Sequence, residues 1–109
     1  MSTDTILNKI DNLIKTNDVV LFMKGDAEMP LCGFSARVAA ILNKLELQFV
    51  GINILEDAAM RQGIKDYTDW PTIPQLYIKG NFIGGCDIVK DMFEKGELQT
   101  LLKEKSLIN

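Results

Sequence analysis

A run of five apolar residues near the N-terminus constrains the fold of this chain more than any other feature. Val19 to Met23 contains no polar residue and ends at Lys24-Gly25. A short, continuous apolar run that includes β-branched side chains is typical of a strand whose two faces are both buried. The sheet that contains it is therefore expected to be covered by helices on both faces.

Helical patterns flank this strand. Before it, apolar residues recur at helical spacing from Ile6 to Ile14, and Ser2, Thr3 or Asp4 can cap the helix that they predict. After the strand comes an irregular stretch and then a second helix, whose first turn contains residues 32–35. The apolar stripe of this second helix consists of Val38, Ile41, Leu42 and Leu45.

The rest of the chain predicts three more strands. Gln48–Leu55 alternates apolar with small or polar residues, and the intervening helix makes it parallel to the first strand. Gln75–Ile78 and Phe82–Gly84 form an antiparallel hairpin around the turn signal Lys79-Gly80-Asn81.

Three further helices are predicted among these strands. One covers Asp57–Tyr67 and is interrupted by Gly63, another opens at Asp87 and stops at Gly96, and the last opens at Glu97. The resulting order predicts an α/β protein with a four-stranded mixed sheet flanked by helices, which is the arrangement of the thioredoxin-like fold. With no repeat or linker, residues 1–109 are expected to be a single domain.

Charge and composition exclude several functions. The net charge is -3 and no Lys/Arg-rich block occurs, so neither nucleic acid nor an anionic membrane is an expected partner. No apolar run approaches the roughly 20 residues that span a bilayer, and Met1 to Lys9 lacks the pattern of a secretory signal. We therefore expect a cytoplasmic protein. The chain has no histidine, which excludes Ser-His-Asp and Cys-His nucleophiles and His-based metal sites.

Cys32, in Cys32-Gly33-Phe34-Ser35, is the candidate reactive group. A thiol at the start of a helix has its thiolate stabilised by unpaired N–H groups and the helix dipole, and Lys24 is the cation expected nearby. A lowered pKa makes Cys32 both a nucleophile and a ligand for a soft metal. The alternative, that Cys32 is a small buried apolar residue, fits poorly with a polar, glycine-containing helix start.

Ser35 stands where a dithiol oxidoreductase has its resolving cysteine. A mixed disulfide on Cys32 must then be resolved by an external thiol such as glutathione, or by Cys86 if the fold brings it close. A [2Fe-2S] cluster needs four sulfur ligands, and a single chain offers one at the helix start. Four sulfur ligands are available if two chains each contribute Cys32 and a bound glutathione.

Two more motifs have the character of a peptide-binding site. In Trp70-Pro71-Thr72-Ile73-Pro74, a cis Pro74 would leave the Ile73 backbone free to pair with an extended peptide; the alternative is a turn with a core tryptophan. In Gly84-Gly85-Cys86-Asp87, the glycines allow close approach, Asp87 can accept from an amine, and free N–H groups can receive a carboxylate. The alternative is a hairpin exit with an ordinary Asp N-cap.

Arg61 and Lys24 are the cations that we assign to the ligand's carboxylate and to the surroundings of the Cys32 sulfur. Taken singly, each is more often a solvated surface charge. The methionines are interpreted as packing or loop residues.

Met23-Lys24-Gly25, Cys32 to Ser35, Trp70 to Pro74 and Gly84 to Asp87, in this order, resemble the monothiol, CGFS-type glutaredoxins. The resemblance runs from about Ile6 to Leu102, covers the long segment before the cysteine, and matches the single-domain form. Ile73 departs from it, because many relatives have an aromatic residue there. A contact made by the backbone should survive that change.

The resemblance implies a glutaredoxin fold, ligation of a [2Fe-2S] cluster by Cys32 in a homodimer, and cluster transfer to apo iron–sulfur proteins, often with a BolA-type partner. It also implies a glutathione site. That site would consist of Lys24, Arg61, the Thr72-Ile73 backbone next to Pro74, Gly85, Cys86 and Asp87.

Three hypotheses remain open. In the first, the chain is mainly an iron–sulfur carrier. In the second, it is a glutathione-dependent oxidoreductase that uses Cys32 as nucleophile, with at most weak enzyme activity. The third is a redox-regulated interaction module with a Cys32–Cys86 disulfide, which requires the two Cα atoms to lie within about 7 Å.

Overall fold

The computed structural model describes residues 2–108, with side chains from Thr5 to Ile108. It confirms the predicted α/β order. The helices are α1 (Ser2–Thr16), α2 (Gly33–Lys44), α3 (Ala58–Thr68), α4 (Cys86–Glu94) and α5 (Glu97–Glu104). The strands are β1 (Val19–Met23), β2 (Val50–Asn53), β3 (Gln75–Ile78) and β4 (Asn81–Gly84), and a 3₁₀ turn, η1, covers Ile54–Glu56.

The four strands form one mixed sheet in the order β2-β1-β3-β4. β1 and β2 are parallel, as a strand–helix–strand connection requires, whereas β3 is antiparallel to β1 and β4 to β3. β1 is therefore a central strand. Its position explains why the whole of the run from Val19 to Met23 is apolar.

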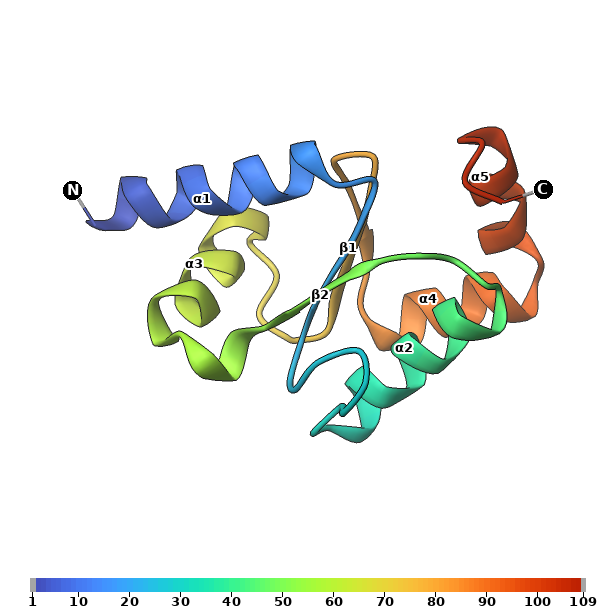
Figure 1. Cartoon of the computed structure of the whole chain (residues 1–109), viewed down its shortest axis with the longest axis horizontal. Helices are drawn as coiled ribbons and strands as arrows, with labels where there is room; N and C mark the ends of the chain where they lie inside the picture. Colours follow the sequence, from blue (N-terminus) through green and yellow to red (C-terminus); the bar gives the residue numbers. More distant parts are fainter. Residues whose placement is uncertain (1, 109) are drawn as a thin grey trace.

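Helices cover both faces of the sheet, as predicted (Figure 1). Alternate residues of β1 point to opposite faces. Val20 and Phe22 pack in a core cluster with residues of α1 and α3. Val19, Leu21 and Met23 pack in a second cluster with residues of α2, α4 and α5.

Three predicted boundaries were wrong. β4 begins at Asn81, one residue before the predicted Phe82. The other two differences have a local cause in a polar residue or a glycine. β2 is shorter than Gln48–Leu55: the Asn53 side chain accepts a hydrogen bond from the Leu55 N–H at 3.0 Å and starts the 3₁₀ turn. α4 begins at Cys86 with Gly85 as its N-cap, so Asp87 lies in the first turn of the helix and does not open it.

The hairpin turn between β3 and β4 lies where the sequence predicts it. The hairpin turn consists of Lys79 and Gly80, both at positive φ (50° and 82°), which is the twist that a two-residue hairpin turn needs. The predicted capping of α1 concerns the side chains of Ser2, Thr3 and Asp4, which lie outside those described. None of the described helices is long and apolar enough to cross a membrane.

Candidate functional site

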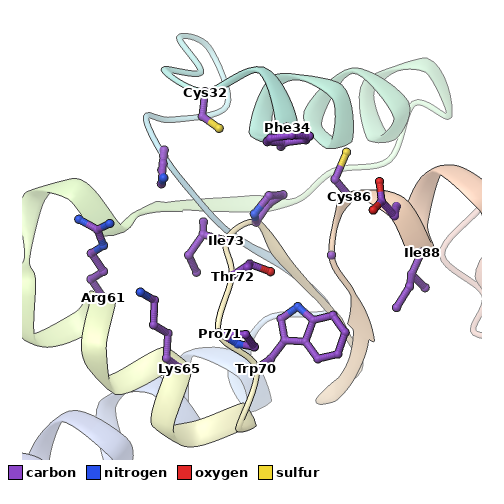
Figure 2. A pocket seen from close by; sticks show the side chains of 14 residues that line it. Cys32, Phe34, Arg61, Lys65, Trp70, Pro71, Thr72, Ile73, Cys86 and Ile88 are labelled. Carbon is purple, nitrogen blue, oxygen red and sulfur yellow. The ribbon is translucent and has the colours of Figure 1, made fainter.

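All nine residues predicted from the sequence line one cleft between α3 and α4 (Figure 2). The cleft has a volume of about 550 Å³, which lies within the usual range for a small-molecule site. The predicted residues are Lys24, Cys32, Arg61, Thr72, Ile73, Pro74, Gly85, Cys86 and Asp87. The other lining residues are Phe34, Lys65, Trp70, Pro71 and Ile88.

Cys32 is the N-cap of α2, at the edge of the cleft, and its thiol is partly exposed. The pKa of this thiol is lowered, mainly because the backbone N–H of Ser35 faces the sulfur; the N–H of Phe34, the charge of Lys24 and the Ser35 hydroxyl add to the effect. Partial burial opposes the shift. The predicted thiolate stabilisation is confirmed, with the helix N–H groups contributing more than Lys24.

The loop that precedes Cys32 is closed on itself. The Leu31 N–H donates to the Lys24 carbonyl at 2.9 Å, and the Asp26 carboxylate accepts from the N–H of Met29 at 2.7 Å. Gly25 has a φ of 85°, and a Cβ there would collide with the loop backbone, so this closed loop needs glycine at position 25. The Gly25 N–H donates to the Asn53 side chain at 3.0 Å, which ties the loop to the end of β2.

The segment Trp70 to Pro74 crosses the cleft between the two helices (Figure 2). Its Ile73–Pro74 peptide bond is cis, as predicted. Within the described part of the chain, the backbone N–H and C=O of Ile73 make no hydrogen bond. The Trp70 ring packs on Phe82 with centroids 5.7 Å apart, so the tryptophan also has the packing role that was the alternative interpretation.

Gly85 and Cys86 form the opposite wall. A Cβ at Gly85 would lie 3.3 Å from the Pro74 carbonyl oxygen, closer than most side chains approach a neighbour. Cys86 is buried, and burial raises the pKa of its thiol. Both cysteines are free, and a Cys32–Cys86 disulfide stays a prediction.

Three positively charged side chains line the cleft. Arg61 and Lys65 lie one turn apart on α3 and both reach into the cleft (Figure 2). Together with Lys24 they make three positive side chains, and none of the three forms an ion pair with another described residue. The sequence analysis missed Lys65, although its spacing of four residues from Arg61 on a predicted helix was a usable signal.

Exposed apolar side chains flank Cys32 in the sequence and line the cleft, which the sequence analysis also missed. Met29, Leu31 and Phe34 are 68%, 62% and 60% exposed, and Ile88 on the opposite wall is 39% exposed. Exposed large apolar residues at a cleft, such as Phe34 and Ile88, are typical of a surface that meets another molecule.

Comparison with known proteins decides the family. The family described as Glutaredoxin matches residues 19–83. The probable monothiol glutaredoxin 2 of Rickettsia typhi is 56% identical over 100 residues, which cover 92% of this chain and 90% of that protein. This chain belongs to the monothiol glutaredoxins.

Solved glutaredoxin structures have the same fold as this monothiol glutaredoxin. Reduced apo GrxS14 from poplar superposes with a TM-score of 0.84 at 45% identity, covering 95% of this chain and 96% of that one. A buckwheat glutaredoxin–glutathione complex superposes with a TM-score of 0.87 at 27% identity, covering 99% and 96%. The predicted thioredoxin-like fold is thereby confirmed.

Proposed function

We propose that this monothiol glutaredoxin binds glutathione in the cleft, holds a [2Fe-2S] cluster between two chains through Cys32, and passes it to apo iron–sulfur proteins. The observation that carries the proposal is the position of Cys32. A partly exposed thiol with a lowered pKa stands beside a cleft lined by Lys24, Arg61 and Lys65. Among the described residues these cations form no ion pair, and the Ile73 backbone makes no hydrogen bond.

The chemistry of the cleft suits glutathione, which is an extended peptide with two carboxylates and one amine. The free backbone of Ile73 would pair with its cysteine residue, as an added strand does. Arg61 and Lys24, joined by Lys65, would take the glycine carboxylate. At the opposite wall, Asp87 would accept from the γ-glutamyl amine, and the N–H groups of Gly85 and Cys86 would receive its carboxylate. The glutathione complex of the similar buckwheat glutaredoxin supports glutathione as the ligand.

The number of suitable thiols in one chain favours a cluster that is shared between two chains. Among the side chains that the structure describes, no group of three or more Cys, Asp or Glu could hold a metal ion. Cys86 is buried at the opposite wall with a raised pKa, which makes it a poor ligand. Cys32 and one glutathione thiol from each of two chains supply the four sulfurs. The cluster is then cargo, and the exposed apolar residues beside Cys32 suit a face that meets a second copy, a BolA-type protein or a recipient.

Glutathione-dependent thiol exchange is the second candidate, supported by the lowered pKa of Cys32. In that reaction the Cys32 thiolate attacks the glutathione sulfur of a protein–glutathione disulfide and the protein thiol leaves. A second glutathione then attacks the Cys32–glutathione disulfide, which frees Cys32 and releases oxidised glutathione. This activity needs no iron.

Anaerobic reconstitution with iron and sulfide, with and without glutathione, separates the two candidates. The visible absorption spectrum and the solution mass should show a [2Fe-2S] dimer only when glutathione is present. Cys32→Ser should abolish both, while Cys86→Ser, which removes the other thiol, should keep the cluster. A colourless monomer under all conditions, together with iron-free reduction of a glutathionylated peptide, would favour thiol exchange.

A further inference from the structure

Beneath the Trp70–Pro74 segment lies a fully buried polar side chain, that of Gln75, the first residue of β3. The exposed fraction of Gln75 is 0%. Among the described residues, Ser35 is also polar and buried. A buried carboxamide is costly unless all its donors and acceptors are used. The Gln75 amide is therefore expected to have hydrogen-bond partners at both ends.

Both ends of the Gln75 amide are hydrogen-bonded. Its Nε2 donates to the carbonyl oxygens of Trp70 at 3.1 Å and Thr72 at 3.3 Å. Its Oε1 accepts from the Tyr77 hydroxyl at 3.1 Å and lies 3.2 Å from the Thr68 hydroxyl. Carbonyl oxygens only accept, so this arrangement needs two donors at one end of the side chain and an acceptor at the other.

These two carbonyls belong to the segment that crosses the cleft. Pro71 and Pro74 have no N–H, which limits the hydrogen bonds that the segment can make by itself. The Gln75 amide bonds to the Trp70 carbonyl, before Pro71, and to the Thr72 carbonyl, after it. The Thr72 carbonyl and the Ile73 N–H belong to the same peptide unit. The orientation of that peptide unit decides where the Ile73 N–H points.

We propose that Gln75 is a positioning residue for glutathione: its buried amide orients the Thr72–Ile73 backbone so that it can pair with the peptide. This inference rests on the proposed glutathione site, and Gln75 itself does not line the cleft. Tyr77 in turn donates to the Gln75 oxygen. The Thr68 hydroxyl donates to the Ile64 carbonyl at 2.8 Å and accepts from the Trp70 N–H at 3.3 Å, so the cleft segment is anchored to both α3 and β3.

The decisive variant is Gln75→Glu, which keeps the shape but places a carboxylate oxygen against the two carbonyls. Calorimetric titration of the reduced apo-protein with glutathione should show affinity about tenfold weaker or more. In the backbone proton–nitrogen spectrum, the amides of Thr72 and Ile73 should shift. The amides of Cys32 to Ser35 and the pKa of the Cys32 thiol should stay unchanged, which a general loss of structure would not allow.

Tyr67→Phe is the matched control. It removes the 2.7 Å hydrogen bond from Tyr67 to Asp11, which does not involve the cleft segment, and Tyr67 packs against the core cluster that contains Tyr77. Glutathione affinity within about twofold of wild type in Gln75→Glu, unmoved Thr72 and Ile73 amides, or an equal loss in Tyr67→Phe would each overturn the proposal.

If Gln75→Glu does not fold, Gln75→Met has no charge to bury and should give the same pattern of amide shifts with a smaller loss of affinity. If the wild-type protein does not bind glutathione, the proposed function fails, and the amide shifts still decide whether Gln75 orients the segment.

Discussion

The backbone N–H of Lys24 donates a hydrogen bond of 3.1 Å to the buried hydroxyl of Ser35. The bond joins the end of the central strand to the first turn of the helix that begins after Cys32. Ser35 thus does more than replace a resolving thiol: its hydroxyl anchors the helix start and also helps to lower the pKa of Cys32.

Ser35→Ala should therefore weaken both the fold and the thiolate. It leaves a partly buried N–H without a partner, which costs about 1–3 kcal/mol in the free energy of unfolding. The Cys32 pKa should rise, because one of the groups that favour the thiolate is lost. Urea denaturation and a thiol titration check the two effects. Thr100→Ala, which removes an exposed hydroxyl on α5, is the control, and equal destabilisation of both variants would contradict the role of Ser35.

The two thiols should differ in reactivity with pH. Alkylation needs the thiolate, so the lowered pKa of Cys32 makes its rate rise at lower pH than the rate of an ordinary cysteine. Cys86 is buried and its pKa is raised, so it should react slowly and only at higher pH. Mass spectrometry of iodoacetamide adducts over a pH series measures both rates.

Lys24→Met refines this prediction. The helix N–H groups contribute more than the lysine charge, so the midpoint for Cys32 alkylation should move up only slightly. A midpoint equal to that of a free thiol in this variant would show that Lys24 is the main cause.

Local patterns predicted the elements of this fold well, and tertiary contacts explain the rest. The Val19–Met23 run and the hairpin strands depend on their own residues; the run and β3 were correct, and β4 was correct to within one residue. Asn53 and Gly85 shifted two boundaries through hydrogen bonds and conformations that periodicity does not show. In the cleft, the predicted residues came from motifs. Lys65, Phe34 and Gln75 were missed because their roles depend on which elements the fold brings together.

Gly63 shows the same limit and leads to a test. The sequence predicted that Gly63 interrupts a helix, but α3 is continuous from Ala58 to Thr68 and Gly63 is buried. A Cβ there would collide with the Ile6 side chain of α1, so glycine serves the close approach of the two helices. Helix propensity alone makes Ala better than Gly by about 1 kcal/mol. We expect Gly63→Ala to destabilise the protein instead, by about 1–3 kcal/mol.

The companion variant is Ile6→Ala. Combined with Gly63→Ala it should cost less than the two single changes added together, since it removes the clash. Gly33→Ala, where a Cβ meets nothing within 4 Å, is the control and should be neutral or stabilising. Urea denaturation gives all four free energies, and additive costs would contradict the steric explanation.

Lys65 should contribute to glutathione affinity through its charge. It lines the cleft one turn from Arg61, and no described acidic residue pairs with it. Lys65→Gln should weaken glutathione binding about threefold to tenfold, as expected for the loss of one partly screened charged contact. Because such contacts are weakened by salt, the affinity of the wild type should fall with ionic strength more steeply than that of the variant. Lys103→Gln, on α5 and outside the cleft, carries the same charge change and should match the wild type in calorimetry. Equal affinities and equal salt slopes in all three proteins would mean that Lys65 does not meet the ligand.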